Sequence, residues 1–309
     1  KKSDTGTSDN SVKYGLGLTV IPKLGDDEFI NMKLIFHIIH NGEAVGEGAN
    51  ISASEINKQV ELLNDNYRNK YGYSNDTRIM FSLADSSPVG SLLEEKGIER
   101  VYRPEKFFGD GLLDEDKNNW VLDLMWDPNR YINIFVFNPA DTYSYSYSTL
   151  PYTTNRFNVP GLKVINEYYL YNPIKRIQGI ALNNKHLSVK YVLTHEMGHY
   201  LGLLHVFNES GCDGDDYCSD TYHYDRSQYV SSKDGYYRTS CSGVRFISDN
   251  FMDYYISYQR KFSVEQELRM RYVINYCPSR YRLWYFKKKY VSTEKVALPP
   301  KPDICYCRY

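Results

Sequence analysis

One stretch, THEMGHYLGLLH at positions 194–205, constrains the fold more than any other part of the chain. Apolar positions through 187–204 predict a helix on which His195 and His199, four residues apart, point from one face. If that helix continued, His205 would lie about 15 Å from His195 along the axis, out of reach of a shared ligand. Gly202 can adopt the left-handed backbone that ends a helix, so we expect the chain to bend there and bring His205 back.

Three imidazoles that meet in this way can hold zinc at about 2.0–2.1 Å and leave the fourth coordination position open for water, as catalytic sites do. Glu196 is adjacent to His195 in the sequence and can accept a proton from a zinc-bound water. Two alternatives are incidental histidines on a half-buried helix, and a two-histidine site completed by a downstream carboxylate such as Glu209.

Hydrophobic patterns upstream of the histidines favour an α+β fold with a mixed sheet. One helix is expected at 51–70, where Ser52 and Glu55 have capping-box spacing. We expect strands at 32–42, 77–84, 97–103 and 130–137, and a strand or turn at 177–184.

A tyrosine and serine alternation occupies part of the segment 138–160, with Tyr143, Tyr145 and Tyr147 at every second position. Such alternation is typical of an exposed edge strand, which can pair with an extended peptide. A solvent-facing loop is the alternative.

The second half of the chain is irregular and carries all six cysteines, at positions 212, 218, 241, 277, 305 and 307. An even number of cysteines in a polar, irregular region favours disulfides in an oxidising compartment over zinc ligation, because no pair has Cys-x-x-Cys spacing. A helix is predicted at 263–277, capped by Ser263, with one face formed by Val264, Leu268, Tyr272 and Ile274.

Charge and hydropathy restrict the class of partner. Lys and Arg number 37 and Asp and Glu number 38, so the formal net charge of −1 gives no broad footprint for nucleic acid or an anionic membrane. No apolar run approaches the roughly 20 residues of a transmembrane helix, so we expect a soluble mature protein. The polar first eleven residues predict a flexible tether.

The stretch DNFMDYY at 249–255, together with HEMGHYLGLLH, resembles the metzincin zinc peptidases. In that clan a methionine turn forms a hydrophobic floor beneath the metal, and Met252 matches this methionine. Tyr254 matches a tyrosine that stabilises the oxyanion in several metzincin families. The flanking segments FNESGCDGDDYCSDT, FSVEQELRM and WDPNRYINIFVF resemble the pappalysin family within the clan.

This resemblance implies a metzincin-like catalytic domain at 29–285, with a substrate cleft between an upper lobe (29–205) of twisted mixed sheet and helices and an irregular, disulfide-stapled lower lobe (206–285). Residues 1–28 would be the tether and 286–309 a C-terminal extension, an extended segment pinned by Cys305 or Cys307. Some relatives are kept latent by a prosegment cysteine on the zinc; no cysteine precedes Cys212, so we expect that device to be absent. The resemblance also implies a Cys218–Cys241 disulfide, which leaves the other four cysteines three ways to pair.

Four carboxylates lie close together in the sequence after the third histidine. Their density and the resemblance predict calcium, with a solvated acidic loop as the alternative; the residues are Asp213, Asp215, Asp216 and Asp220.

These observations predict a zinc endopeptidase that hydrolyses peptide bonds of extracellular proteins or peptides, in which Glu196 acts as general base on a zinc-activated water. We expect it to be secreted or exposed at the cell surface, with any leader or lipid anchor removed. The alternative is a catalytically silent surface protein that binds polypeptide or glycan on a peptidase scaffold.

Overall fold

The computed structural model describes residues 28–105, 108, 111–140, 145–170, 172, 174–229, 235–254, 257–281, 283 and 299–307. Its largest element is a seven-stranded sheet in the order β13-β5-β8-β4-β1-β2, with β3 also paired to β1. The strands are β1 (Ile30–His40), β2 (Ile79–Leu83), β3 (Ile98–Tyr102), β4 (Tyr131–Phe137), β5 (Ser146–Thr149), β8 (Ile180–Asn183) and β13 (Ile304–Cys307).

The sheet is mixed, as the sequence predicts. β1 pairs in parallel with β2, β3 and β4, and β4 pairs in parallel with β8. β5 runs antiparallel to β8, and β13 runs antiparallel to β5.

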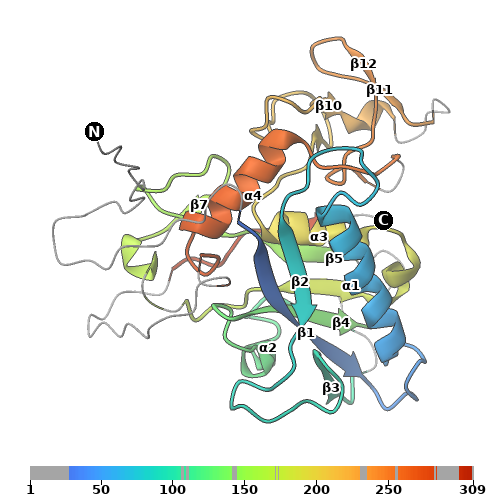
Figure 1. Cartoon of the computed structure of the whole chain (residues 1–309), viewed down its shortest axis with the longest axis vertical. Helices are drawn as coiled ribbons and strands as arrows, with labels where there is room; N and C mark the ends of the chain where they lie inside the picture. Colours follow the sequence, from blue (N-terminus) through green and yellow to red (C-terminus); the bar gives the residue numbers. More distant parts are fainter. Residues whose placement is uncertain are drawn as a thin grey trace, which may run out of the picture.

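Both faces of the sheet are covered, which explains why β1 and β4 carry buried apolar side chains on both faces. Along β1, Leu34 and Phe36 pack into the largest hydrophobic cluster, which includes side chains of α1 (Ala53–Tyr67) and α3 (Val192–Tyr200). Ile39 packs on the opposite face, in a cluster that includes Val121 of α2 (Trp120–Leu124). α1 lies along the sheet in Figure 1. Its N-cap is Ser52, whose hydroxyl accepts from the Glu55 amide at 3.2 Å.

The predicted edge strand lies beside α3. Residues 141–144 are outside the described part of the chain, and the strand itself is β5, all of whose residues are buried. The alternative of a solvent-facing loop is therefore wrong for this strand. The predicted exposed edge is wrong as well, because β13 of the same chain pairs with the outer side of β5.

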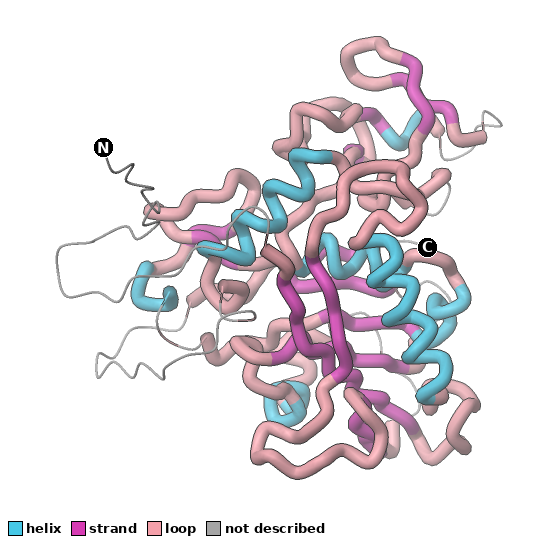
Figure 2. The backbone as a smooth tube through the Cα atoms, in the orientation of Figure 1, coloured by secondary structure: helices cyan, strands magenta, loops and turns pink. Residues whose placement is uncertain are grey.

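Beyond His205 the chain forms short elements joined by long loops (Figure 2). Two small two-stranded sheets form here, β9 (Phe207–Asn208) with β10 (Tyr224–Asp225), and β11 (Tyr237–Thr239) with β12 (Arg245–Ile247). The 3-10 helix η3 (Arg226–Gln228) also lies in this part of the chain. Before His205, the short elements are β6 (Tyr152–Thr153), β7 (Lys163–Val164), and the 3-10 helices η1 (Glu167–Leu170) and η2 (Asn184–Ser188).

The predicted helix at 263–277 is α4 (Val264–Tyr276), which begins with a capping box between Ser263 and Gln266. The prediction of its buried face is wrong, because Val264, Leu268 and Tyr272 are exposed. The buried residues include Arg269, whose guanidinium donates to the backbone carbonyl oxygens of Gly202 and Pro160, each at 2.7 Å. Arg271 likewise donates to Thr77 O at 3.1 Å. The same buried face carries Met270, Val273 and Ile274, a helical apolar period that the predicted face does not follow.

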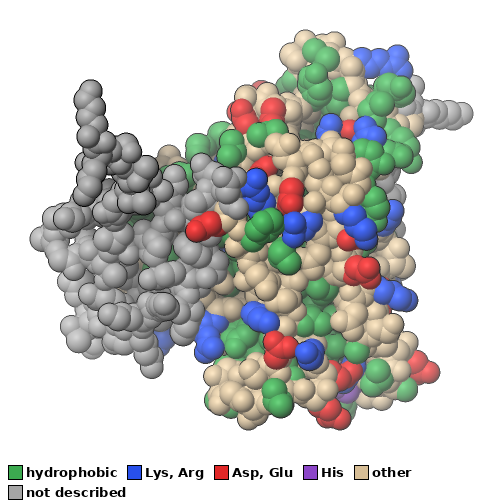
Figure 3. All heavy atoms as spheres, viewed as in Figure 1, with side chains coloured by type: hydrophobic (Ala, Val, Ile, Leu, Met, Phe, Trp, Pro, Cys, Tyr) green, Lys and Arg blue, Asp and Glu red, His purple; other side chains and the backbone are tan. Residues whose placement is uncertain are grey.

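Among the described residues, no helix is long and apolar enough to span a bilayer. Basic and acidic side chains are intermixed on the face seen in Figure 3. The predicted tether at the start of the chain lies outside the described residues, as does most of 286–309.

Candidate metal centre

The helix that carries the first two histidines is α3, which is shorter than the predicted 187–204. It begins at Val192 and ends at Tyr200, and every one of its residues is buried. The preceding residues 184–188 form the 3-10 helix η2 instead, and Tyr191 at the start of α3 has a left-handed backbone with φ of 75°. α3 therefore holds His195 and His199 one turn apart inside the protein, on a rigid support.

The chain turns sharply just after α3. Gly202 has φ of +94°, and its amide donates to His199 O at 2.9 Å. A Cβ built on Gly202 would lie 2.7 Å from Cγ2 of Val273, so both the backbone and the space require glycine. This turn brings His205 back toward the helix.

The three histidines converge through their Nε2 atoms. The Nε2–Nε2 distances are 3.0 Å for His195–His199, 3.1 Å for His199–His205 and 3.2 Å for His195–His205. Tetrahedral zinc with bonds of about 2.0–2.1 Å requires ligand nitrogens about 3.3 Å apart. The cluster therefore has the dimensions of a zinc site.

Hydrogen bonds fix the ring orientation of two of these histidines. Nδ1 of His195 donates to Phe251 O at 2.6 Å, and Nδ1 of His199 donates to Leu203 O at 2.8 Å. Burial lowers the pKa of His195 to about 4 and lowers the pKa of His199 and His205 below the ordinary histidine value, so the rings are neutral. A neutral ring with its proton on Nδ1 has a lone pair on Nε2, and converging lone pairs repel one another unless a cation lies between them.

A fourth donor, which the sequence reasoning missed, completes this group. Sγ of Cys307 lies 3.2 Å from Nε2 of His195, 3.3 Å from that of His199 and 3.4 Å from that of His205. Among the described residues, these four side chains form the only group of metal-binding type and spacing. The sequence excluded only a prosegment cysteine on the zinc, because no cysteine precedes Cys212. The available signal was the alternation of Cys305 and Cys307 in the otherwise unassigned tail.

Glu196 is fully buried on α3, next to the cluster. Its carboxylate forms a hydrogen bond with the thiol of Cys307. Burial is the main cause that raises the pKa of Cys307 above its ordinary value, and the negative charge of Glu196 adds to it. The predicted base, Glu196, is therefore in direct contact with the fourth donor, Cys307.

The chain after β12 supplies the floor of the site. Met252 is fully buried, and a Cβ built on Gly198 of α3 would lie 2.4 Å from its Sδ, so glycine at 198 allows the methionine to approach the helix. The ring of Tyr254 lies edge-on to that of His205, with centroids 5.0 Å apart. Its hydroxyl donates to Glu209 Oε1 at 3.0 Å, and burial raises its pKa. Glu209, the alternative third ligand, thus bonds to Tyr254 and is outside the four-residue group.

The structure does not bring the four acidic residues together as one ligand group. Asp220 accepts from the hydroxyl of Ser263 at 2.6 Å and from the amide of Glu265 at 2.9 Å, at the start of α4. Asp216 is buried and accepts from Thr221 at 2.8 Å. Asp213 and Asp215 are exposed in the preceding loop. Calcium stays a prediction.

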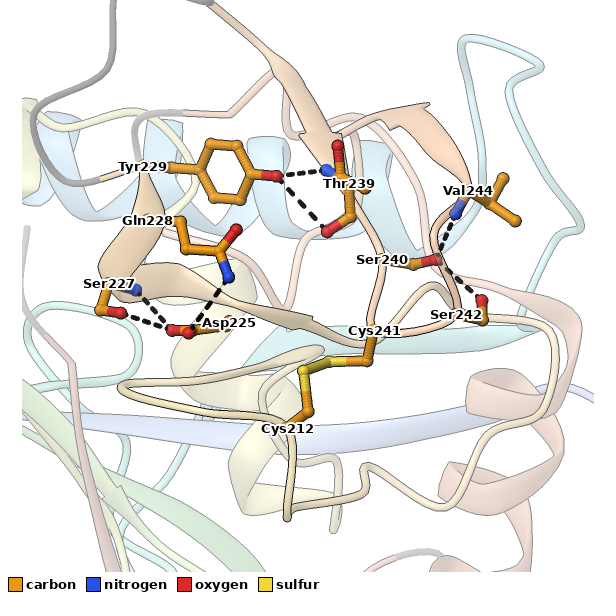
Figure 4. The surroundings of a disulfide bond; sticks show 10 residues. All are labelled: Cys212, Asp225, Ser227, Gln228, Tyr229, Thr239, Ser240, Cys241, Ser242 and Val244. Carbon is orange, nitrogen blue, oxygen red and sulfur yellow. Dashed lines mark hydrogen bonds between the residues drawn. A yellow bond between two sulfur atoms is a disulfide. The ribbon is translucent and has the colours of Figure 1, made fainter.

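One disulfide forms in the described part of the chain, between Cys212 and Cys241 (Figure 4). The predicted Cys218–Cys241 pair is therefore wrong. Cys212 and Cys241 are exposed with Cα atoms 5.9 Å apart, whereas Cys218 is buried. Cys277, Cys305 and Cys307 are also free, so the remaining predicted pairings do not form.

Comparisons with known proteins agree with this arrangement. The model of a peptidase family described as pregnancy-associated plasma protein-A matches residues 115–275. An extracellular metalloprotease of Sordaria macrospora is 25% identical over 262 residues, which is 80% of this chain and 75% of that protein. An extracellular metalloprotease of Neurospora crassa is 26% identical over 246 residues, 78% of this chain and 73% of that protein.

Solved structures of mirolysin from Tannerella forsythia share the fold. Mature mirolysin in complex with a cleaved peptide has a TM-score of 0.61 and 22% identity, and the match covers 84% of this chain and 97% of that one. A promirolysin mutant has a TM-score of 0.61 and 23% identity, and the match covers 85% of each chain.

Proposed function

Since the chain belongs to the metallopeptidase family of pregnancy-associated plasma protein-A, we propose that it hydrolyses internal peptide bonds of extracellular proteins, with Glu196 as general base. The metzincin and pappalysin resemblance and the α+β fold predicted from the sequence are confirmed. The observation that carries the catalytic proposal is the convergence of three neutral imidazoles directly beside a buried glutamate.

His195, His199 and His205 would hold zinc through their Nε2 atoms. Bound zinc supplies Lewis acidity, which polarises a carbonyl oxygen and makes water a better nucleophile near neutral pH. The hydrogen bonds from His195 to Phe251 O and from His199 to Leu203 O keep two rings aimed at the ion. Met252 packs against Gly198 of the ligand helix and so supports it.

Glu196 and Tyr254 would handle proton and charge. The Glu196 carboxylate accepts a proton from the attacking water and returns it to the nitrogen of the leaving amine. The Tyr254 hydroxyl, whose raised pKa keeps it protonated, donates a hydrogen bond to the oxyanion. To do so, the hydroxyl must leave Glu209.

We place the substrate along β5. The outer edge of this strand accepts an extended segment in antiparallel register, with Ile304 opposite Thr149 and Cys307 opposite Ser146. A substrate strand in the same position would run past the histidines, because Cys307 contacts them from there.

An extracellular site of action is supported by the names of the two fungal relatives and by the exposed Cys212–Cys241 disulfide. Calcium bound at Asp213, Asp215, Asp216 or Asp220 remains part of the proposal, and the unfolding temperature with and without calcium tests it.

Digestion of casein with and without a chelator tests the proposed activity. The assay includes the Cys307→Ser variant, because the thiol of the native chain lies against the histidines. We expect digestion that the chelator abolishes and added zinc restores. Absence of digestion by both proteins, with zinc bound, would favour the silent binding protein.

A further inference from the structure

We propose that Cys307 is the fourth protein ligand of the zinc and that residues 299–307, the docked segment, act as an intramolecular inhibitor of the site. The inference rests on the proposed peptidase function and adds the regulation of that site. Four independent features of the described residues support it.

The first feature is the coordination geometry. A zinc ion with bonds of about 2.0–2.1 Å to nitrogen and 2.3 Å to sulfur requires nitrogen–sulfur separations of about 3.5 Å at tetrahedral angles. The three separations from Cys307 Sγ are 3.2, 3.3 and 3.4 Å. The fourth donor therefore lies where tetrahedral zinc would hold it, and at a similar distance from each imidazole.

The second feature is what a fourth protein ligand does to a catalytic metal. Structural zinc sites are closed by four protein side chains, whereas catalytic sites keep one position for water or substrate. Cys307 would fill that position as a thiolate. Its hydrogen bond with Glu196, the proposed base, then requires the proton to be on the carboxyl group, so Glu196 cannot accept one from water. In this arrangement the site has neither an open coordination position nor an available base.

The third feature is the strand pairing that delivers the thiol. β13 pairs residue by residue with β5 from Ile304–Thr149 to Cys307–Ser146. Because side chains alternate along a strand, Cys305 and Cys307 share one face and Tyr306 is on the other. The ring of Tyr306 packs on that of Tyr147 with centroids 4.8 Å apart. The register is thus fixed on both faces, and the thiol points to the histidines.

The fourth feature is a set of polar contacts that hold the rest of the docked segment. Lys163 donates to Lys301 O at 2.9 Å and forms an ion pair with Asp303 at 2.5 Å. Further contacts are Leu150 N to Asp303 O at 2.7 Å, Tyr152 Oη to Pro300 O at 2.6 Å, Arg176 Nε to Pro299 O at 3.0 Å, and Lys301 Nζ to Asp114 Oδ1 at 3.0 Å. The segment is therefore bound along its length, before the cysteine is reached.

A substrate strand and the docked segment would compete for one edge of β5 and one coordination position. Turnover then scales with the fraction of molecules in which the docked segment is released. Removal of Cys307 should raise turnover, while loss of any of the three histidines should abolish it.

X-ray absorption at the zinc edge of the full chain is the direct test, because it does not depend on activity. We expect one sulfur neighbour at about 2.3 Å in the native protein. Cys305→Ser is the matched control and should retain the sulfur, since Sγ of Cys305 lies 4.0 Å from His205 Nε2, beyond the three contacts of Cys307. A Cys305→Ser/Cys307→Ser double variant, loaded with zinc, should show only nitrogen and oxygen neighbours. The double variant prevents Cys305 from replacing the lost thiol.

Peptidase assays on the same proteins test inhibition. We expect the double variant to turn over a peptide substrate at least about tenfold faster than the native chain, which corresponds to a native open fraction below about a tenth. Cys305→Ser should match the native rate. Lys163→Ala, which weakens the docked segment without touching the histidines, should raise turnover by a smaller factor and reduce the sulfur signal.

The outcomes separate this inference from the proposed function. Native protein that binds zinc without a sulfur neighbour and is as active as the double variant refutes the inference and leaves the peptidase standing. A sulfur neighbour with no activity in the double variant refutes inhibition and indicates a closed structural site. Absence of zinc from every protein refutes both.

Discussion

The regions before and after His205 are held together by different forces. In residues 30–205, alternate side chains of β1 and β4 pack into hydrophobic clusters on the two faces of one sheet. In residues 206–281 the sheets have two strands each, and arginines lie over tyrosine rings, such as Arg226 over Tyr254 at 4.3 Å. The first region is built around one sheet. The second combines α4 and apolar side chains that join the same core, such as Phe262 and Met270, with loops held by a disulfide and local contacts.

The candidate metal centre uses both regions, in different ways. The core region supplies reactive side chains on α3, where packing allows little movement. The loop region supplies a backbone carbonyl from Phe251, the floor residue Met252 and the ring of Tyr254. Changes in the first region should therefore act mainly on chemistry, and changes in the second mainly on stability.

Glu196→Ala should have the largest effect, and on chemistry alone. A general base contributes about 10²–10⁴-fold to rate, so we expect a loss of turnover of that size. The measurement is the rate of peptide hydrolysis in the Cys305→Ser/Cys307→Ser background, where Cys307 does not contact the base.

Zinc content and unfolding midpoint are the controls for Glu196→Ala. Both should stay close to those of the parent, because the carboxylate is not one of the four converging donors. Unchanged turnover in a zinc-loaded variant would rule out Glu196 as the base.

Loss of the Cys212–Cys241 disulfide should affect stability and spare chemistry. The bond joins residues 29 positions apart, and the chain-entropy relation gives roughly 3–4 kcal/mol for a loop of that size. We expect Cys212→Ser/Cys241→Ser to lower the free energy of unfolding by about this amount, measured by urea denaturation.

Reductant provides the matched comparison for the disulfide. The bonded cysteines are both exposed, so reductant should shift the native protein toward the midpoint of the serine variant and leave the variant unchanged. If the folded serine variant loses turnover while it keeps its zinc, the loop region contributes to the reaction as well as to the stability of the fold.

Gly202→Ala should act on both properties, because Gly202 joins the two regions. A left-handed backbone costs a non-glycine residue about 1–2 kcal/mol, and the contact with Val273 adds to this cost. Gly211→Ala is the matched control: φ is +78° there and a Cβ would meet nothing within 4 Å. We expect unfolding experiments to show a larger loss for Gly202→Ala, with zinc affinity reduced only in that variant. Equal losses would contradict the steric argument.

Local patterns explain what the sequence could predict. The helix, the bend at Gly202 and the spacing of three histidines depend on about a dozen consecutive residues, so backbone geometry alone indicates their arrangement. β1, β4 and the cap of α1 are likewise encoded within single segments. The exposed edge strand predicted within 138–160 is instead buried as β5, because β13 of the same chain pairs with its outer side.

Long-range contacts explain what the sequence could not predict. Cys307 is 102 residues from His205 along the chain, and its position depends on the pairing of β13 with β5. The disulfide partner of Cys241 depends on how the loop after His205 folds, which left Cys212 and Cys218 indistinguishable by spacing. The buried face of α4 carries Met270, Val273 and Ile274. It was mispredicted because Arg269 and Arg271, of a type that is usually exposed, lie on the same side and donate to backbone carbonyls.

Tyr254→Phe should have the smallest effect and tests whether the loop region contributes to chemistry at all. A donor already aimed at an oxyanion is worth about 10²–10³-fold in rate. The Tyr254 hydroxyl donates to Glu209 and must break that bond first, which offsets part of the gain. We therefore expect a loss of about tenfold in turnover, measured in the Cys305→Ser/Cys307→Ser background.

Tyr258→Phe is the matched control for Tyr254→Phe, because Tyr258 is on the same segment but 48% exposed. It should leave turnover unchanged. If Tyr254→Phe also leaves turnover unchanged while lowering the unfolding midpoint, the hydroxyl serves only the bond to Glu209. The division between a chemical core region and a stabilising loop region would then be complete. A tenfold loss with an unchanged midpoint would instead show that the loop region supplies one group to the reaction.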